Sequence, residues 1–257
     1  MSFVTYIPRP PLSKFVDMFW LYRRDASTHA KERLLPTGTM ELVMSLADDS
    51  SGATVCGAHS ESFEIETKPA LVLGAHFKPG GAFPFLGVPA GELHNARVSL
   101  ETLWGTNAGA LRDQVLAAKT WAAKFGVLEQ MLMKQSTRPF VRHPAVEFAL
   151  NEFHAATHVR TVAEVVDKIG FSPRRFIQLF RNEVGLTPKV YRRIHRFQQL
   201  LQRVHGAQRI DWAHVAVECG YYDQAHFISD FRAFSGLNPT AYLQAQGEHL
   251  NHIPLMD

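Results

Sequence analysis

The second half of the chain contains the same short pattern twice, about fifty residues apart. Gly170-Phe171 is matched by Gly220-Tyr221, and the residues that follow are matched at an offset of fifty-one. The later pairs are Ser172/Asp223, Phe176/Phe227, Phe180/Phe231, Arg181/Arg232, Gly185/Gly236, Pro188/Pro239 and Tyr191/Tyr242. Each copy predicts a short helix, a turn after glycine and a capped helix that ends at a second glycine. The sequence therefore predicts two helix-turn-helix units, with the extra residue Tyr222 confined to the second turn.

The second helix of the first copy has two distinct faces. Its apolar face recurs at helical spacing: Phe176, Leu179, Phe180 and Val184. The other face follows the i, i+3, i+4, i+7 spacing: Arg174, Ile177, Gln178 and Arg181. A short helix that is anchored on one side and presents Arg and Gln on the other suits a DNA major groove. Such a helix alone could be an ordinary amphipathic helix, but a chance basic helix has no reason to recur with its cap, flanking helix and glycine stop.

The positive charge of the chain is concentrated in the same half. Residues 1–137 carry 13 Lys or Arg and 13 Asp or Glu, whereas residues 138–247 carry 14 and 9. Seven of the basic residues lie close together: Arg174, Arg175, Arg181, Lys189, Arg192, Arg193 and Arg196. This modest basic cluster is the electrostatic footprint expected of a nucleic-acid-binding surface.

Composition and cysteine count exclude several classes of protein. The chain is 46% hydrophobic and 20% charged, which is typical of a folded rather than a disordered protein. Cys56 and Cys219 are the only cysteines, which argues against a disulfide framework or a cysteine-rich zinc site and fits a reducing cytosol. The first residues do not resemble a secretory signal, and no apolar run approaches the roughly 20 residues that cross a bilayer. We expect a soluble, cytoplasmic protein without a membrane partner.

The first hundred residues predict a small, mainly antiparallel β domain. A short helix is expected at 11–18, followed by a β-prone aromatic run at 19–22. Further short apolar or alternating runs are separated by Pro, Gly, Asp and Ser: 34–46, 53–59, 62–66 and 70–77. The Gly-rich turn at 78–81 is not a phosphate loop, because no GxxxxGK[ST] pattern follows a strand there.

The rest of the chain predicts helices. Residues 110–134 favour two helices broken near Lys119–Thr120 or at Gly126, and a polar, proline-closed boundary follows at 136–139. Seven helices are expected beyond it: 144–155, 162–169, 173–184, 188–204, 212–219, 224–234 and 239–245. We therefore expect an α+β protein with four parts: a β-rich domain at 1–106, a helical linker at 107–137, a DNA-binding domain at 138–247 and a tail at 248–257.

A narrow apolar stripe in the linker, made by Leu128, Met131 and Leu132, has two interpretations. It is either intramolecular core, which is the more frequent case, or the seam of a homodimer.

The doubled pattern resembles the AraC/XylS family of bacterial transcription regulators. The first copy reads G-F-S-P-x-x-F-x-x-x-F-R-x-x-x-G-x-x-P-x-x-Y and the second G-Y-x-D-x-x-x-F-x-x-x-F-R-x-x-x-G-x-x-P-x-x-Y. The resemblance covers about residues 140–247 and implies seven helices, with two helix-turn-helix units and a connecting helix. More loosely, LPTGTMELVMSL and GAHFKPGGAF resemble the cupin-like β domains fused to some of these regulators. The family implies double-stranded DNA and RNA polymerase as partners, no cofactor and no enzymatic activity, and commonly a small-molecule effector or a dimer contact on the β domain.

The resemblance also indicates which residues contact DNA. Family positions that read bases coincide with Arg174, Ile177 and Gln178 of the first unit. The corresponding face of the second unit carries Gln224, Ala225, Ile228 and Ser229. Phosphate contacts are expected from basic residues around these faces: Arg175, Arg181, Arg192, Arg193 and Arg232. Because Arg and Gln can pair with guanine and adenine, the first unit should dominate sequence discrimination, and Asp230 would repel phosphate unless it is paired.

An effector pocket in the β domain would use its aromatic side chains. The candidates are Trp20, Tyr22, Phe63, Phe77 and Phe83. For each ring the competing interpretation is ordinary core packing, which is the more frequent case.

Three other functions compete with an effector-controlled regulator. A cupin-type metalloenzyme would need an H-x-H pair, and neither His59 nor His76 has a histidine two residues away. A DNA-repair fusion with a cysteine-ligated zinc site is excluded by two isolated cysteines, and no metal is expected. A ligand-independent architectural DNA binder remains open, as do the effector, the operator, and activation versus repression.

Two arginine substitutions should distinguish contacts to DNA bases from contacts to DNA phosphates. We expect Arg174→Ala to relax specificity at one base pair, because it removes a base-pairing side chain worth roughly 1–3 kcal/mol. Arg232→Ala should weaken all sites alike, because a phosphate contact carries no sequence information. Binding-site selection with each variant measures both effects. An unchanged consensus for Arg174→Ala would refute its assignment.

Overall fold

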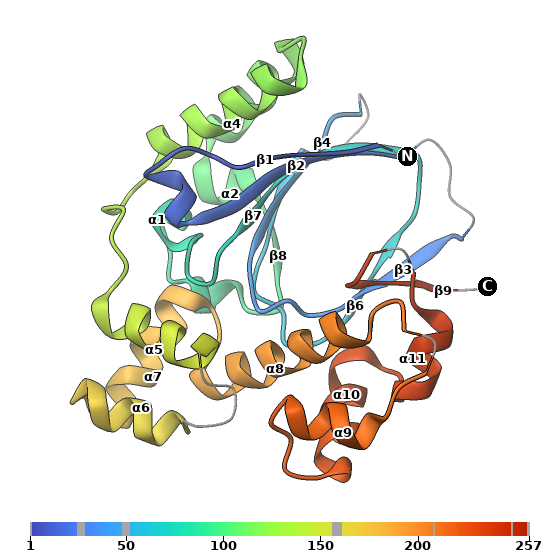
Figure 1. The fold of residues 1–257 in the computed structure, drawn as a ribbon. Helices are drawn as coiled ribbons and strands as arrows, with labels where there is room; N and C mark the ends of the chain where they lie inside the picture. Colours follow the sequence, from blue (N-terminus) through green and yellow to red (C-terminus); the bar gives the residue numbers. More distant parts are fainter. Residues whose placement is uncertain are drawn as a thin grey trace.

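The computed structural model describes residues 2–24, 29–47, 52–155, 161–207, 209–247 and 249–255. The N-terminal part contains a six-stranded antiparallel sheet, in the order β1 (Ser2–Tyr6), β2 (Val16–Arg24), β7 (Ala70–Phe77), β4 (Glu41–Ser45), β5 (Ala53–Cys56) and β8 (Arg97–Ser99). A second sheet has the order β6 (Phe63–Glu66), β3 (Lys31–Leu34) and β9 (His252–Leu255). The two sheets face each other across the β domain (Figure 1).

Helices cover one face of the larger sheet and then form the C-terminal half. The short helical elements are η1 (Leu12–Lys14), α1 (Phe83–Leu86), η2 (Ala90–Leu93) and α2 (Leu100–Trp104). The longer helices are α3 (Thr106–Ala117), α4 (Trp121–Gln135), α5 (Pro144–Ala155), α6 (Val162–Ile169), α7 (Pro173–Val184), α8 (Pro188–Val204), α9 (Trp212–Glu218), α10 (Gln224–Ser235) and α11 (Pro239–Ala245). The predicted α+β class is confirmed, and every expected helix beyond residue 138 is present to within one residue at its ends.

The larger sheet has a packed face and a half-exposed face. Strand alternation places Phe19 and Leu21 of β2 against the linker helices, where the Phe19 and Phe125 ring centroids lie 6.4 Å apart. The alternate residues of the same strand, Trp20 and Tyr22, point to the other face and remain partly accessible. The core of the β domain therefore lies between its sheet and the linker helices, rather than between the two sheets.

Two expectations for the linker and the N-terminus were resolved by packing. The break in the linker falls at residues 118–120, with the Thr120 side chain accepting from the backbone N–H of Ala123, and Gly126 lies inside α4. The expected helix at 11–18 is wrong in extent. Only residues 12–14 are helical, because β2 already begins at Val16 and pairs along its length with β7.

The stripe Leu128, Met131 and Leu132 is buried in the core of this chain. The structure therefore favours the interpretation as intramolecular core over that of a homodimer seam.

The segment expected as a tail forms a strand of the β domain. His252–Leu255 pairs antiparallel with β3, in register Lys31↔Leu255 to Leu34↔His252. The Nδ1 atom of His252 lies 2.8 Å from Oε2 of Glu32, a carboxylate that also meets Arg24 and His29. Bonds with His252 and His29 and the nearby Arg24 charge lower the pKa of Glu32 to about 2, despite its burial. The end of the chain is thus fixed to the domain in which the chain begins.

Substitution at Ile253 tests the packing of β9 against the β domain. Its side chain is 1% exposed, so Ile253→Ala should lower the free energy of unfolding by roughly 2–5 kcal/mol. The matched control is Ile7→Ala, which changes a side chain that is 73% exposed and should cost less than about 0.5 kcal/mol. Urea unfolding of both variants makes the comparison. Equal, small effects would contradict the packing of β9.

Candidate nucleic-acid interface

The first predicted recognition helix, α7, is built as its sequence suggests. The Ser172 side chain accepts from the backbone N–H of Arg175, Pro173 occupies the first turn, and Gly185 ends the helix with φ of 94°. Phe176 and Phe180 are fully buried, and the Phe180 ring packs edge-on against Tyr191 of α8. The preceding helix, α6, begins with a capping box of Thr161 and Glu164. These contacts fix the helix axis and leave its other face to solvent.

That solvent face holds the three residues predicted to read bases. Arg174 and Gln178 are exposed, and Ile177 is 40% exposed although it is a large apolar side chain. Gln178 Nε2 donates to Oδ1 of Asn182 at 2.7 Å, which orients its amide along the helix. The guanidinium of Arg175 lies 4.3 Å from the Phe171 ring centroid, at the edge of the same face. The structure therefore brings these side chains together on one surface.

The second helix, α10, presents a poorer surface of the same kind. Gln224, Ala225 and Ser229 are exposed, and Ile228 is half-buried. Oδ1 of Asp223 accepts from the backbone N–H of His226 at 2.7 Å, which confirms the predicted cap. Arg232 is exposed and lines a hollow of about 250 Å³ together with Gln224 and Ile228.

Asp230 is buried and paired, so it does not repel phosphate from the surface. Its Oδ1 accepts from Nη2 of Arg193 at 2.7 Å, and its Oδ2 accepts from Nη2 of Arg196 at 3.1 Å. The sequence assigned Arg193 to a DNA phosphate, whereas the structure gives its guanidinium to Asp230. The sequence flagged Asp230 but not its partners, because they lie 34 and 37 residues earlier on another helix.

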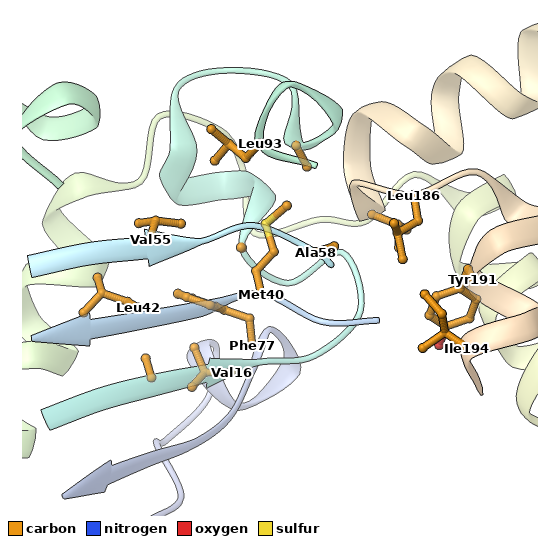
Figure 2. Packing of buried hydrophobic residues seen from close by; sticks show 14 of the residues in the cluster. Val16, Met40, Leu42, Val55, Ala58, Phe77, Leu93, Leu186, Tyr191 and Ile194 are labelled. Atoms are coloured by element: carbon orange, nitrogen blue, oxygen red, sulfur yellow. The ribbon is translucent and has the colours of Figure 1, made fainter. Parts of the chain in front are cut away.

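Arg181, also assigned to phosphate, lies at a contact between the two halves of the chain. Its Nη2 donates to the carbonyl of Gly91 in η2 at 3.4 Å. A Cβ on Gly91 would come within 2.7 Å of Arg181 Cγ, so the close approach needs glycine. The end of α7 therefore packs against the β domain, as Figure 2 shows for Met40 and Ala58 opposite Leu186. No pattern in the sequence indicated this contact.

Glu183 is a buried carboxylate at the same contact. It is 5% exposed, its Oε2 accepts from the backbone N–H of His143 at 3.3 Å, and Nε of Arg142 is 3.8 Å from its Oε1. Burial raises the pKa of Glu183 to about 7, against the lowering effects of the His143 bond and the Arg142 charge. This group ties the stability of the α7 contact to pH.

The aromatic candidates for an effector pocket do not share one site. Phe77 is buried on the helix-covered face, 5.7 Å from Phe85 between ring centroids, and Phe83 lies in α1 beneath Arg138. Trp20 and Tyr22 instead lie on the half-exposed face of β2, and Phe63 is half-buried on β6. The five residues therefore lie on two faces of the larger sheet, on the smaller sheet and in a helix, and the sequence alone does not show which face of a sheet each ring occupies.

Two further properties concern metals and membranes. In the part of the chain that the structure describes, no three His, Cys, Asp or Glu side chains are grouped so that they could hold a metal ion. None of the described helices is both long and apolar enough to span a bilayer.

Comparisons with known proteins match the two halves separately. Residues 4–99 match the family described as "Domain of unknown function (DUF6597)", and residues 165–245 match the family described as "Helix-turn-helix domain". A comparison with curated proteins gives no significant match.

Solved structures of ToxT from Vibrio cholerae show a distant likeness. One has 11% sequence identity and a TM-score of 0.40, covering 95% of this chain and 98% of that chain. A second, bound to (E)-4-(8-methylnaphthalen-1-yl)but-3-enoic acid, has 11% identity and a TM-score of 0.42, covering 95% and 99%. At these TM-scores the likeness transfers no function to this chain.

The raised pKa of Glu183 predicts a pH dependence of stability. A carboxyl group whose pKa is higher in the folded than in the unfolded protein stabilises the fold at low pH, and that stabilisation is lost as pH rises from about 4.5 to 7. Glu183→Gln removes the ionisable group. We therefore expect the free energy of unfolding of the variant at pH 8 to be higher than that of the original protein by roughly 3 kcal/mol. Near pH 4.5 the two proteins should have similar free energies of unfolding.

Thermal melts of both proteins across this pH range measure the difference between them, which cancels the titration of other groups. A difference that does not grow with pH would contradict a raised pKa at Glu183.

Proposed function

We propose that this DNA-binding transcription regulator, whose AraC-type helix-turn-helix domain follows a domain of the DUF6597 family, reads two successive major grooves with α7 and α10. The observation that carries the proposal is the arrangement of the two capped helices along α8 (Figure 1): α7 packs at its beginning, where Phe180 meets Tyr191, and α10 packs beside its middle, where Phe231 meets Phe197. A 17-residue helix such as α8 spans about 25 Å at 1.5 Å per residue. With the width of the two units added, the recognition helices suit grooves about 34 Å apart on one face of DNA.

The two helices contribute unequally in this proposal. Arg174 can make a bidentate bond to guanine and Gln178 to adenine, each worth roughly 1–3 kcal/mol of discrimination. Ile177 can contact a thymine methyl group or exclude a base. On α10 only Gln224 and Ser229 can bond to base edges, while Ala225 and Ile228 offer apolar contact. The half-site read by α7 therefore carries most of the sequence information.

The proposed phosphate contacts are fewer than the sequence suggested. Arg175, Arg192 and Arg232 remain candidates: Arg175 and Arg232 are exposed on α7 and α10, and Arg192 lines a pocket on α8. Arg181 and Arg193 are committed to Gly91 and Asp230, respectively, so we assign them to the protein framework. Bound DNA would place the chain beside RNA polymerase at a promoter, as the family resemblance implies.

We further propose that a small molecule binds the half-exposed face of the larger sheet. Trp20 and Tyr22 of β2, Val43 of β4 and Val72 of β7 share this face and are all partly accessible. Apolar side chains inside a folded domain are normally buried, so the accessibility of these four favours a ligand with apolar surface, beside the paired Glu41 and His76 on the same face. Phe63 of β6 lies on the opposite sheet and would contact such a ligand from the other side.

The alternative is an architectural DNA binder without a preferred sequence. The scarcity of hydrogen-bonding side chains on α10 favours it, since backbone contacts and DNA shape could supply most of the binding energy at that unit. Such a protein would bind selected and random duplexes with similar affinity and with the same steep salt dependence.

Selection of binding sites from a random duplex pool separates the two functions. We expect two half-sites spaced about one DNA turn, 10–10.5 base pairs, from centre to centre. Shuffling the half-site bound by α7 should weaken binding by at least about tenfold, or ~1.4 kcal/mol, and shuffling the other half should weaken it less. Titrations at two salt concentrations measure both effects. Equal affinity for selected and fully shuffled duplexes would overturn sequence-specific regulation and support the architectural function.

A further inference from the structure

A basic pocket of about 210 Å³ lies on α8, between the two helix-turn-helix units. Six side chains in its wall are basic or imidazole groups: Lys189, Arg192, Arg193, His195, Arg196 and His226. Phe153 of α5 and Val162 of α6 line it from the first unit, and His226 of α10 lines it from the second. The pocket is therefore a place where both units meet the helix that joins them.

The pocket opens away from the β domain. Lys189, Arg192, Arg193 and Arg196 follow the i, i+3, i+4, i+7 spacing and so share one face of α8. The opposite face carries Tyr191 and Ile194, whose side chains lie close to Gly38 of the β domain. At the pocket's two ends lie the first residue of α6 and the first turn of α10. The pocket therefore lies on the side of α8 at which the second recognition helix, α10, begins.

The charges around the pocket do not cancel. Asp230 bonds to both Arg193 and Arg196, so one carboxylate is shared between two guanidinium groups. Within the described residues, no salt bridge is found at Lys189 or Arg192. The Arg192 guanidinium lies 5.7 Å from the Phe153 ring centroid, and in the same part of the chain Glu164 is the one carboxylate whose charge acts on it. Burial and the neighbouring Arg196 charge lower the pKa of Arg192. Partly buried positive charge without enough carboxylates is a surface that an anion stabilises.

We propose that this pocket binds one phosphate of the DNA backbone, at the stretch between the two grooves read by α7 and α10. The inference rests on the proposed function and adds an anchoring site between the half-sites. The basic lining suits an anion, and Arg192 and Lys189 supply charge-assisted donors. A phosphate bound here touches elements of both units, so it fixes their spacing on DNA as well as adding affinity.

Asp230 acts in this site as a positioning residue. It is 3% exposed and lies on the buried side of α10, from which it reaches across to α8. By holding Arg193 and Arg196 it keeps their guanidinium groups in the pocket wall and joins the second unit to the connecting helix. From the sequence, the negative charge of Asp230 was expected to repel phosphate unless paired; in the structure it holds the basic side chains of the pocket in place.

Substitution of single phosphates tests the proposal on the full-length protein. A duplex with the selected site is made with one neutral methylphosphonate at a time, scanning the linkages between the half-sites. We expect a single position, or two adjacent ones, where the neutral linkage weakens binding by roughly tenfold. Lys189→Ala should weaken binding to the unmodified duplex and lose most of that sensitivity, because the linkage and the side chain act on one contact. Its salt slope should fall by about 0.9.

The matched control is Lys134→Ala, which removes an exposed lysine of α4 and should leave the methylphosphonate pattern unchanged. Lys189 is itself exposed, so its variant should fold normally. If the original protein binds the selected duplex but Lys189→Ala leaves the pattern intact, the pocket assignment is overturned and the proposed function stands. If the original protein binds no duplex, both are overturned.

An assay with inorganic phosphate tests whether the pocket binds a free anion instead of a DNA phosphate. Added at constant ionic strength, it should compete with DNA for the original protein and not for Lys189→Ala. A rise in melting temperature with inorganic phosphate, together with a flat methylphosphonate scan, would assign the pocket to a free anion and overturn a DNA contact.

Discussion

The packing of α8 on both of its sides is the interaction on which the rest of the structure depends. Its apolar residues, from Tyr191 to Val204, are buried against both helix-turn-helix units and the β domain. Gln198 adds a polar contact, since its Nε2 donates to the carbonyl of Pro36 at 2.8 Å. Both helix-turn-helix units and the β domain pack against this one continuous helix. The spacing of the two units and their attachment to the β domain are therefore determined by the same contacts.

Each recognition unit is also tied to the β domain at its own end. The end of α7 contacts η2 through Arg181, and the end of α10 receives a bond from Arg33 of β3 to the carbonyl of Ser235 at 3.3 Å. Strand β9 then returns to β3, so the smaller sheet lies between the half-exposed face and the second unit. A change in that sheet has a direct physical route to α10, and a change near η2 has one to α7.

The helices of the DNA-binding half were predictable because local chemistry decides them. The side chains of five residues cap helices: Ser172, Thr187, Asp211, Asp223 and Asn238. The glycines that end α7 and α10 both have a left-handed backbone. The exposed reading face of α7 followed from the same periodicity. The face of the sheet on which each strand residue lies was harder to predict. Trp20 and Phe77 occur in similar apolar runs of the sequence, yet they point to opposite faces of one sheet.

What the sequence determined by itself is the doubled unit: its helices, caps, buried rings and the side chains left over for DNA. These depend on neighbours within about one helical turn or on a repeat that confirms itself. Only the tertiary structure decided which charges are available, because Arg193 bonds Asp230 and Arg181 bonds Gly91 across 37 and 90 residues. It also decided that the chain end closes onto β3, through backbone bonds that any short alternating segment could make. Long-range pairing carries no local signature, and for that reason it appears only when the chain is folded.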